Sequence, residues 1–250
     1  MPVLNYVFPE HLSVAQSQLP RTVDMLSIYS NLFGLYPFIS EKYGHAEWGE
    51  TGTAAMEYQT MTSIRGLITG WEAFDEEIVA HELAHQWFGD MITMASWPHV
   101  WLNEGFATYC PALYYGEKYG TASYTYSVYI ASVMESAKGA GGSVYIRDTL
   151  NVPMLFDYFR VYAKGATVLH MLRHVLGDSV FFHSLRAYAQ DPRFRFGVAT
   201  TEDFQQVCET VSGKDLGYFF SEWIYGEQYP IYTYSWSAIP DTSGGHLVTI

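Results

Sequence analysis

The sequence HELAHQW, from His81 to Trp87, contains two histidines four positions apart with a glutamate directly after the first. Because four positions are just over one turn of an α-helix, His81 and His85 should project from the same side, with Cα atoms about 6 Å apart. Two imidazoles at this spacing can bind one zinc ion, and Glu82, about 100° further round the helix, can hold a water molecule beside it. The acidic run of residues 75–77 suits the N-terminus of such a helix. The pattern therefore predicts a zinc site on a helix.

The other side of this helix carries a packing face. Val79, Leu83 and Trp87 recur at i, i+4 and i+8, the spacing of an apolar row. The pattern alone is also compatible with two ordinary polar or packing histidines, because a bare H-E-x-x-H occurs by chance. The zinc interpretation therefore depends on a third ligand elsewhere in the chain.

The stretch WLNEGFATY, from Trp101 to Tyr109, provides a candidate for that ligand. It is typical of the opening of a second helix, and an antiparallel return would bring Glu104 back to the two histidines. An exposed helix acid is the alternative, since glutamates are usually exposed. However, an unpaired carboxylate would be costly in such an apolar and aromatic segment. We therefore expect Glu104 to complete a His-His-Glu zinc site that keeps a fourth position open.

Two further stretches accompany these motifs: AAMEY, from Ala54 to Tyr58, and VYAKGA, from Val161 to Ala166. The four segments, HELAHQWFGD and WLNEGFATY included, resemble in order and approximate spacing the zinc core of the M1 family of aminopeptidases. This family of gluzincins includes aminopeptidase N and leukotriene A4 hydrolase. The resemblance covers most of the chain and is far more specific than H-E-x-x-H alone.

The resemblance implies a substrate-binding stretch formed by Ala54, Ala55, Met56 and Glu57. It would lie along a peptide like an extra strand, and Glu57 would bind the free α-amino group. That group has a pKa of about 7.7–8.0 and is largely cationic at neutral pH, so a partly buried carboxylate can select for it. Ala54 and Tyr58 replace the glycine and asparagine that are commonest in this motif, which puts a substrate hydrogen bond in question. A solvent-facing glutamate is the alternative for Glu57.

The resemblance also implies the catalytic roles. One Zn²⁺ ion would be held by His81, His85 and Glu104, with Glu82 as general base. Tyr162 would donate its hydroxyl to the oxygen that becomes negative in the tetrahedral intermediate. Without the resemblance, core packing would be the default for Tyr162, one of 21 tyrosines.

Composition restricts the possible partners. The chain has 250 residues, 49% hydrophobic and 17% aromatic, which predicts a packed globular protein. Its net charge of −13 would repel nucleic acid phosphates and anionic lipid, so neither is expected as a partner. The charge is compatible with metal ions and peptide N-termini, and the resemblance implies peptides with a free N-terminus as substrates. No apolar run reaches the roughly 18 residues of a membrane span. Cys110 and Cys208 are expected to be free buried thiols, although a bridge between them is possible. Composition does not define the oligomeric state.

We expect an α+β, mainly helical fold: a thermolysin-like metallopeptidase catalytic domain with a small β-containing lobe and a larger helical lobe. Residues 1–228 would form this domain, and 229–250 would be a β-hairpin that starts a truncated following β domain. Pro111 should kink the Glu104 helix or end it early, at a cost of about 3 kcal/mol if the helix stays straight. Other helices are expected near 11–33, 121–136, 155–160, 165–176, 178–189, 201–212 and 214–224, and strands within 39–48 and 56–64.

The expected reaction is hydrolysis of the first peptide bond of a peptide with a free amino terminus. A zinc endopeptidase would share His81, Glu82 and His85 but would need no amine-binding residue. An epoxide hydrolase could use the same metal, but nothing in the sequence indicates its lipid pocket. A non-enzymatic alternative is a peptidase-like peptide-binding module, inactive without the N-terminal domain that family members carry.

Overall fold

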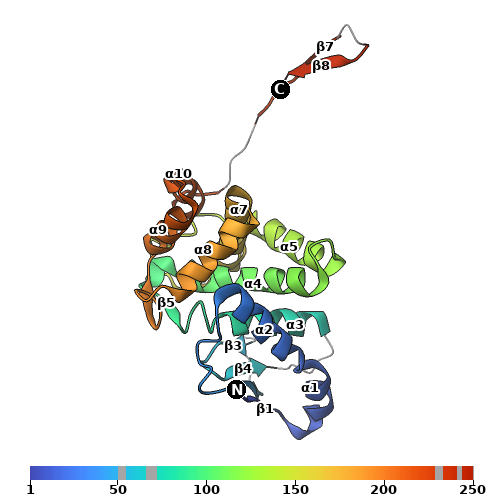
Figure 1. Ribbon diagram of the computed structural model, residues 1–250, viewed down its shortest axis with the longest axis vertical. Coiled ribbons are helices and arrows are strands. Elements are labelled where there is room, and N and C mark those ends of the chain that lie inside the picture. The colour runs from blue at the N-terminus through green and yellow to red at the C-terminus, as the bar shows by residue number, and fades with distance from the viewer. Residues whose placement is uncertain (50–54, 66–71, 229–232, 241–243, 250) are drawn as a thin grey trace.

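The computed structural model describes residues 1–49, 55–65, 72–228, 233–240 and 244–249, with only the backbone described at 72–75 (Figure 1). Figure 1 shows an N-terminal lobe that contains a sheet, a larger lobe of helices, and the helices α3 (Glu72–Ala84) and α4 (Trp101–Tyr119) between them. The expected mainly helical α+β fold with two lobes is confirmed.

The N-terminal lobe is built on a four-stranded sheet. Its strands are β1 (Val3–Tyr6), β2 (Tyr43–Trp48), β3 (Ala55–Met56) and β4 (Thr62–Arg65), in the order β1-β2-β4-β3. The pairs β1–β2 and β2–β4 are parallel, whereas β3 is antiparallel to β4. Parallel pairing requires a crossover connection, which here contains η1 (Pro9–His11), α1 (Leu12–Gln18) and α2 (Arg21–Phe33). The sequence analysis missed β1, because this short edge strand has largely exposed side chains and no alternating pattern.

The helical lobe follows α4 in the chain. Its elements are α5 (Tyr124–Ala137), α6 (Val152–Leu155), the π-helix η3 (Tyr158–Lys164), α7 (Gly165–Leu176), α8 (Asp178–Gln190), α9 (Thr201–Ser212), α10 (Gly217–Phe220) and the π-helix η4 (Ser221–Tyr225). A short parallel pair, β5 (Ile92–Met94) with β6 (Gly197–Ala199), connects the segment after α3 to this lobe, and the 3₁₀-helix η2 (Trp97–His99) precedes α4. The expected helices at 178–189 and 201–212 correspond closely to α8 and α9.

Trp87 anchors the end of α3 in the core. Its side chain is 1% exposed, and its indole Nε1 donates to the Gly34 carbonyl at 2.9 Å. The rings of Tyr29, Phe33 and Tyr36 surround it, with centroids 5.6–6.1 Å away and edge-to-face geometry. Edge-to-face pairs at such distances are favourable beyond the area that they bury. The packing face predicted for this segment is therefore buried, and it ties the segment that carries His81 and His85 to α2.

Pro111 does not end α4. The helix continues to Tyr119, so the expectation of an early end is wrong. Every residue from Trp101 to Tyr115 is buried, and burying a large apolar side chain contributes about 1.5–3 kcal/mol. Several such side chains together outweigh the cost of about 3 kcal/mol for an interior proline.

The C-terminal residues form a hairpin that projects away from the helical lobe (Figure 1). Strands β7 (Ser237–Pro240) and β8 (His246–Thr249) pair antiparallel, and every residue in them is exposed. Residues 229–232 and 241–243, which the sequence analysis placed in the hairpin and its turn, lie outside the described residues. The assignment of this hairpin to a following domain stays a prediction.

Two smaller expectations can be compared with the fold. Cys110 and Cys208 are both buried and free, as expected. Within the residues that the structure describes, no helix has the length and apolar character that crossing a membrane would require.

Candidate metal centre

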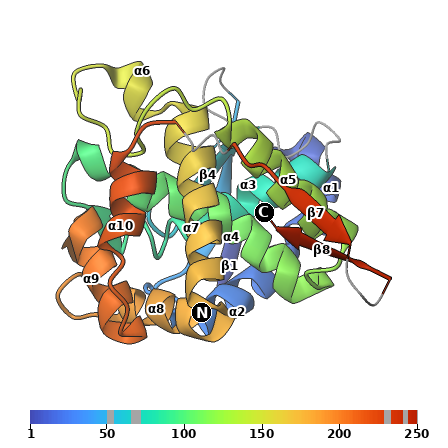
Figure 2. The same cartoon turned by 90° about the horizontal axis from the view of Figure 1, so that it is seen from above.

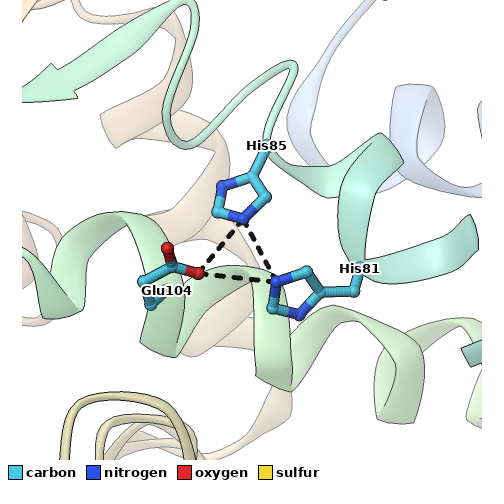
Figure 3. Close-up of side chains that lie close together, drawn as sticks. All are labelled: His81, His85 and Glu104. Carbon is cyan, nitrogen blue, oxygen red and sulfur yellow. Dashed lines mark hydrogen bonds and ion pairs between the residues drawn. The ribbon is translucent and has the colours of Figure 1, made fainter. Parts of the chain in front are cut away.

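Three side-chain atoms converge where α3 meets the first turn of α4 (Figure 3). His85 Nε2 lies 3.2 Å from His81 Nε2, and Glu104 Oε2 lies 3.5 Å from His81 Nε2 and 3.2 Å from His85 Nε2. Zinc binds imidazole nitrogen and carboxylate oxygen at about 2.0–2.2 Å, so ligand atoms at the corners of a tetrahedron are about 3.3–3.6 Å apart. The three separations are close to this range. The residues predicted as ligands therefore fit three corners of a tetrahedral zinc site.

His85 is held in place by the turn that follows α3. The sequence analysis placed both histidines on the helix, but α3 ends at Ala84 and His85 is the first residue beyond it. Its Nδ1 lies 3.1 Å from the Phe88 carbonyl, which can only accept, so the neutral ring carries its proton on Nδ1 and turns the lone pair of Nε2 toward Glu104. Gly89 has φ of +151°, and a Cβ there would lie 3.0 Å from His85 Nδ1. Glycine at this position leaves room for the ring.

Glu104 and His85 perturb each other's titration. Glu104 is 9% exposed; burial alone would raise its pKa, but the charge on His85 holds the pKa well below its usual range. Burial opposes a charge on His85, yet the Glu104 carboxylate outweighs it and raises the pKa of His85 to about 10. Glu104 Oε2 is buried without a hydrogen-bond partner among the described residues. A buried carboxylate oxygen without such a partner, facing two imidazole nitrogens, has the chemistry of a cation ligand.

Glu82 and Glu57 lie beside the predicted ligands. One ligand atom each from Glu57, Glu82 and His85 lies within 4.8 Å of the others. Glu82 is 8% exposed, and its Oε2 has no hydrogen-bond partner in the described part of the chain. Burial raises the pKa of Glu82, although the nearby histidines oppose this shift. A raised pKa makes the carboxylate a stronger base, so the geometry is compatible with the base role predicted for Glu82 and brings the Glu57 carboxylate close to it.

Tyr162 reaches the same centre from the helical lobe. Its ring stacks on the His81 ring, with centroids 6.2 Å apart and planes 14° apart. Burial, followed by the charge of Glu104, raises the pKa of Tyr162 above its ordinary value, so the hydroxyl keeps its proton at neutral pH and can donate. The sequence analysis expected helices at 155–160 and 165–176, whereas a π-helix, η3, carries Tyr162. Such π segments are frequent at functional sites.

A glycine pair that the sequence analysis did not single out brings α4 and α7 together. A Cβ on Gly105 would lie 3.0 Å from Gly165 Cα, and a Cβ on Gly165 would lie 3.1 Å from Gly105 Cα. Figure 2 shows α7 crossing α4, and the absence of both Cβ atoms permits this approach. Because Gly105 follows Glu104 and Gly165 lies three residues after Tyr162, the crossing brings the predicted third ligand and the tyrosine to one centre. The two glycines lie inside the motifs WLNEGFATY and VYAKGA, and this position is the signal that could have identified them.

The predicted substrate-binding stretch lies at an edge of the N-terminal sheet. Ala55 and Met56 form β3, which pairs with β4 and is the last strand in the order of the sheet. Ala54 lies outside the described residues. An extended peptide can add to a strand edge through main-chain hydrogen bonds. The position of β3 is therefore compatible with the role predicted for this stretch, and Tyr58 next to it is largely exposed.

Sequence reasoning gave no role to Gln86, which follows His85. Its side chain is fully buried and donates to the Glu57 carbonyl at 3.2 Å and to Asp90 Oδ2 at 2.7 Å. Burial raises the pKa of Asp90 to about 7, against the influence of His85. A polar residue at this point of the motif has no periodic signal, so its burial became visible only in the structure.

The fold and the site together define a metallopeptidase type of centre, and comparison with known proteins identifies the family. A family model described as the peptidase family M1 domain matches residues 18–223. Aminopeptidase M1 of Arabidopsis thaliana is 31% identical over 234 residues, which cover 90% of this chain and 24% of the plant protein. Aminopeptidase N of Lactococcus lactis subsp. lactis is 33% identical over 163 residues, covering 62% of this chain and 19% of that protein.

A solved structure agrees with these matches. The M1 zinc metallopeptidase from Deinococcus radiodurans aligns with a TM-score of 0.68 at 29% identity, covering 84% of this chain and 45% of that chain. The chain belongs to peptidase family M1, which confirms the resemblance inferred from the four motifs. It spans 24% of the length of its Arabidopsis relative and less than half of the Deinococcus structure.

Proposed function

We propose that this chain carries the catalytic centre of a zinc aminopeptidase, which hydrolyses the first peptide bond of peptides with a free α-amino group. The observation that carries the proposal is the convergence of His81, His85 and Glu104 on one point, with carboxylates of Glu57 and Glu82 beside it. Family membership supports it, since the curated relatives are named aminopeptidases and the Deinococcus structure is described as a zinc metallopeptidase. The cofactor of this site is Zn²⁺.

The side chains divide the work of hydrolysis. His81, His85 and Glu104 would hold Zn²⁺, which would supply a Lewis acid for the scissile carbonyl and a water molecule. Glu82 accepts a proton from the attacking water and passes it to the departing amine. The Tyr162 hydroxyl donates to the carbonyl oxygen as negative charge develops there, and this interaction strengthens only along the reaction path.

Glu57 accounts for removal of a single residue. Its carboxylate lies within 4.8 Å of ligand atoms of Glu82 and His85, so an ammonium group bound to it would place the first peptide bond next to the base. An endopeptidase would need no such carboxylate. Free peptides should therefore be cleaved, whereas N-acetylated peptides of the same sequence should not, because they lack the cation.

The decisive test combines metal analysis with an aminoacyl-arylamide assay on the zinc-loaded protein. Glu82→Gln should retain zinc but lower kcat by about 10²–10⁴-fold, because the amide cannot accept the proton. Glu10→Gln provides a matched control in the N-terminal lobe and should leave kcat unchanged. Equal activity of wild type and Glu82→Gln would show that Glu82 is not the base. Wild-type protein that binds no zinc would contradict the proposed metal site.

A further inference from the structure

The buried amide of Gln86 has a polar partner at each of its donor and acceptor positions. Its Nε2 donates to the Glu57 carbonyl at 3.2 Å and to Asp90 Oδ2 at 2.7 Å. Its Oε1 accepts from the Thr60 backbone N–H at 2.9 Å and lies 3.1 Å from the Tyr36 hydroxyl. A side-chain amide has two N–H donors and two acceptor lone pairs. Both donors and one lone pair are paired, and the second lone pair shares the Tyr36 hydroxyl with the Lys42 carbonyl oxygen, which also lies 3.1 Å from that hydroxyl.

The partners fix the orientation of this amide. The Thr60 backbone N–H can only donate and must face Oε1, whereas the Glu57 carbonyl can only accept and must face Nε2. Turning the amide over would leave the buried Thr60 N–H and the partly buried Glu57 carbonyl without these partners. Gln86 directly follows His85, and its side chain is hydrogen-bonded to both ends of the segment 57–60.

That segment contains a strained turn. Thr60 has φ of +63°, which is a rare conformation for a β-branched residue. Such strain persists only where the surroundings impose it. On one side Gln86 holds the Thr60 N–H, and on the other Lys42 Nζ donates to the Thr60 carbonyl at 3.3 Å and to its hydroxyl at 3.4 Å. The Met61 N–H closes the turn on the Tyr58 carbonyl at 2.9 Å.

We propose that Gln86 is a positioning residue that sets the distance between the Glu57 carboxylate and the metal centre. Gln86 is the neighbour of His85 in the chain, and its side chain holds the backbone of Glu57 and Thr60 by hydrogen bonds. The segment with the amine-binding carboxylate is therefore fixed relative to the segment with the metal ligands. The role rests on the proposed aminopeptidase function. It extends that function, because substrate register then depends on a residue that touches neither peptide nor metal.

The main test compares Gln86→Met with Tyr36→Phe in the zinc-loaded full chain. Gln86→Met keeps the length of the side chain but releases Glu57 and Thr60. Tyr36→Phe removes a hydroxyl that lies 3.1 Å from Gln86 Oε1 and 3.1 Å from the Lys42 carbonyl oxygen. It keeps the hydrogen bonds of Gln86 to Glu57 and Thr60. For an aminoacyl arylamide, Gln86→Met should raise KM about tenfold and change kcat less than about threefold, since a ground-state contact is lost. Tyr36→Phe should stay within about twofold of wild type, and both variants should keep their zinc.

Two further measurements keep the proposal testable if Gln86→Met folds poorly. Lys42→Met releases the opposite side of the turn from a partly exposed position and should raise KM about threefold with zinc retained. In the wild-type chain, the Thr60 amide should exchange with solvent slowly, and Gln86→Met should speed its exchange more than Tyr36→Phe does. Equal KM values for Gln86→Met and Tyr36→Phe, or a loss confined to kcat, would overturn the proposal, as would an unchanged KM in Lys42→Met.

Failure of the aminopeptidase function is distinguishable from failure of this role. A zinc-loaded wild type that cleaves no peptide would refute the function. Calorimetric binding of an amino acid amide, with its N-acetylated form as the blank, would then replace KM. Weaker binding of the amide by Gln86→Met than by Tyr36→Phe supports the positioning role, and equal binding by both contradicts it.

Discussion

Two histidine pairs in this chain share one geometry but differ in their surroundings. The rings of His81 and His85 have centroids 4.8 Å apart and planes 79° apart. Those of His170 and His174, also four positions apart and both on α7, have values of 4.7 Å and 76°. Among the described residues, Glu104 joins the first pair within 4.8 Å, and no third histidine, cysteine, aspartate or glutamate ligand atom joins the second pair within that distance. Spacing of histidines on a helix is therefore not sufficient to define a metal site.

The difference extends to charge. Against the effect of burial, the Glu104 carboxylate raises the pKa of His85 to about 10. In the other pair, burial together with the positive charges of His174 and Arg173 lowers the pKa of His170 to about 4. A carboxylate attracts a cation to the first pair, whereas an arginine repels one from the second. The contrast shows that Glu104, which is distant in sequence from His81 and His85, gives the first pair a cation-attracting carboxylate, whereas the second pair has only burial and neighbouring positive charges.

The largest expected effect comes from removing that third residue. Glu104→Ala should weaken zinc binding by more than about a hundredfold, the upper range for residues that only orient ligands, because it deletes a ligand and a negative charge. Zinc affinity can be measured by competition with a chromogenic chelator. His170→Ala serves as the control and should retain the wild-type affinity. Unchanged zinc affinity in Glu104→Ala would show that the carboxylate does not distinguish the His81–His85 pair from the His170–His174 pair.

A pH titration of zinc binding should separate the pairs next. In the metal-free protein His85 is protonated below a pKa of about 10, so zinc must displace its proton. Zinc affinity should therefore fall about tenfold for each unit that the pH is lowered below this value. Calorimetry in two buffers of different ionisation enthalpy should show about one proton released near neutral pH. His170, with its lowered pKa, is neutral there and should contribute none, so proton release should be the same in His170→Ala.

The sequence predicted the parts of this centre that are encoded locally or by motif. Helix geometry predicted that His81 and His85 share one side, although α3 ends at Ala84 and a turn holds His85. Glu104 was predicted because it lies in a segment where a free carboxylate would be costly. The roles of Glu57 and Tyr162 came from family resemblance alone, because a single tyrosine or strand glutamate has no pattern of its own.

Features that depend on long-range packing could not be predicted. The crossing of α4 and α7 depends on Gly105 and Gly165, which lie sixty positions apart and are ordinary glycines until the helices meet. The hydrogen bonds of Gln86 join three separate segments, and no periodicity indicates them. Local propensity predicts a kink or an early end at Pro111, and the burial of α4 overcomes the early end.

A smaller effect is expected at the crossing of α4 and α7, which holds Glu104 beside the His81–His85 pair. Gly105→Ala would place a Cβ 3.0 Å from Gly165 Cα and 3.3 Å from the Val161 carbonyl oxygen. Alanine favours the helix by about 1 kcal/mol, but these neighbours are backbone atoms and cannot move independently. We expect a net loss of about 1–2 kcal/mol in the free energy of unfolding, measured by denaturant titration. A stabilised Gly105→Ala protein would show that the approach of α7 does not hold Glu104 in position.

The smallest effect should come from the exposed member of the second pair. His174 is exposed, and its Nδ1 lies 2.9 Å from the His170 carbonyl, an interaction that water can replace. His174→Ala should therefore change the free energy of unfolding by no more than about 0.5 kcal/mol and leave zinc stoichiometry and affinity unchanged. Metal analysis of this variant beside His81→Ala tests the comparison directly, because each substitution removes one imidazole from a pair of the same geometry. Loss of a zinc equivalent from His174→Ala would show that a histidine pair can bind the metal without its carboxylate.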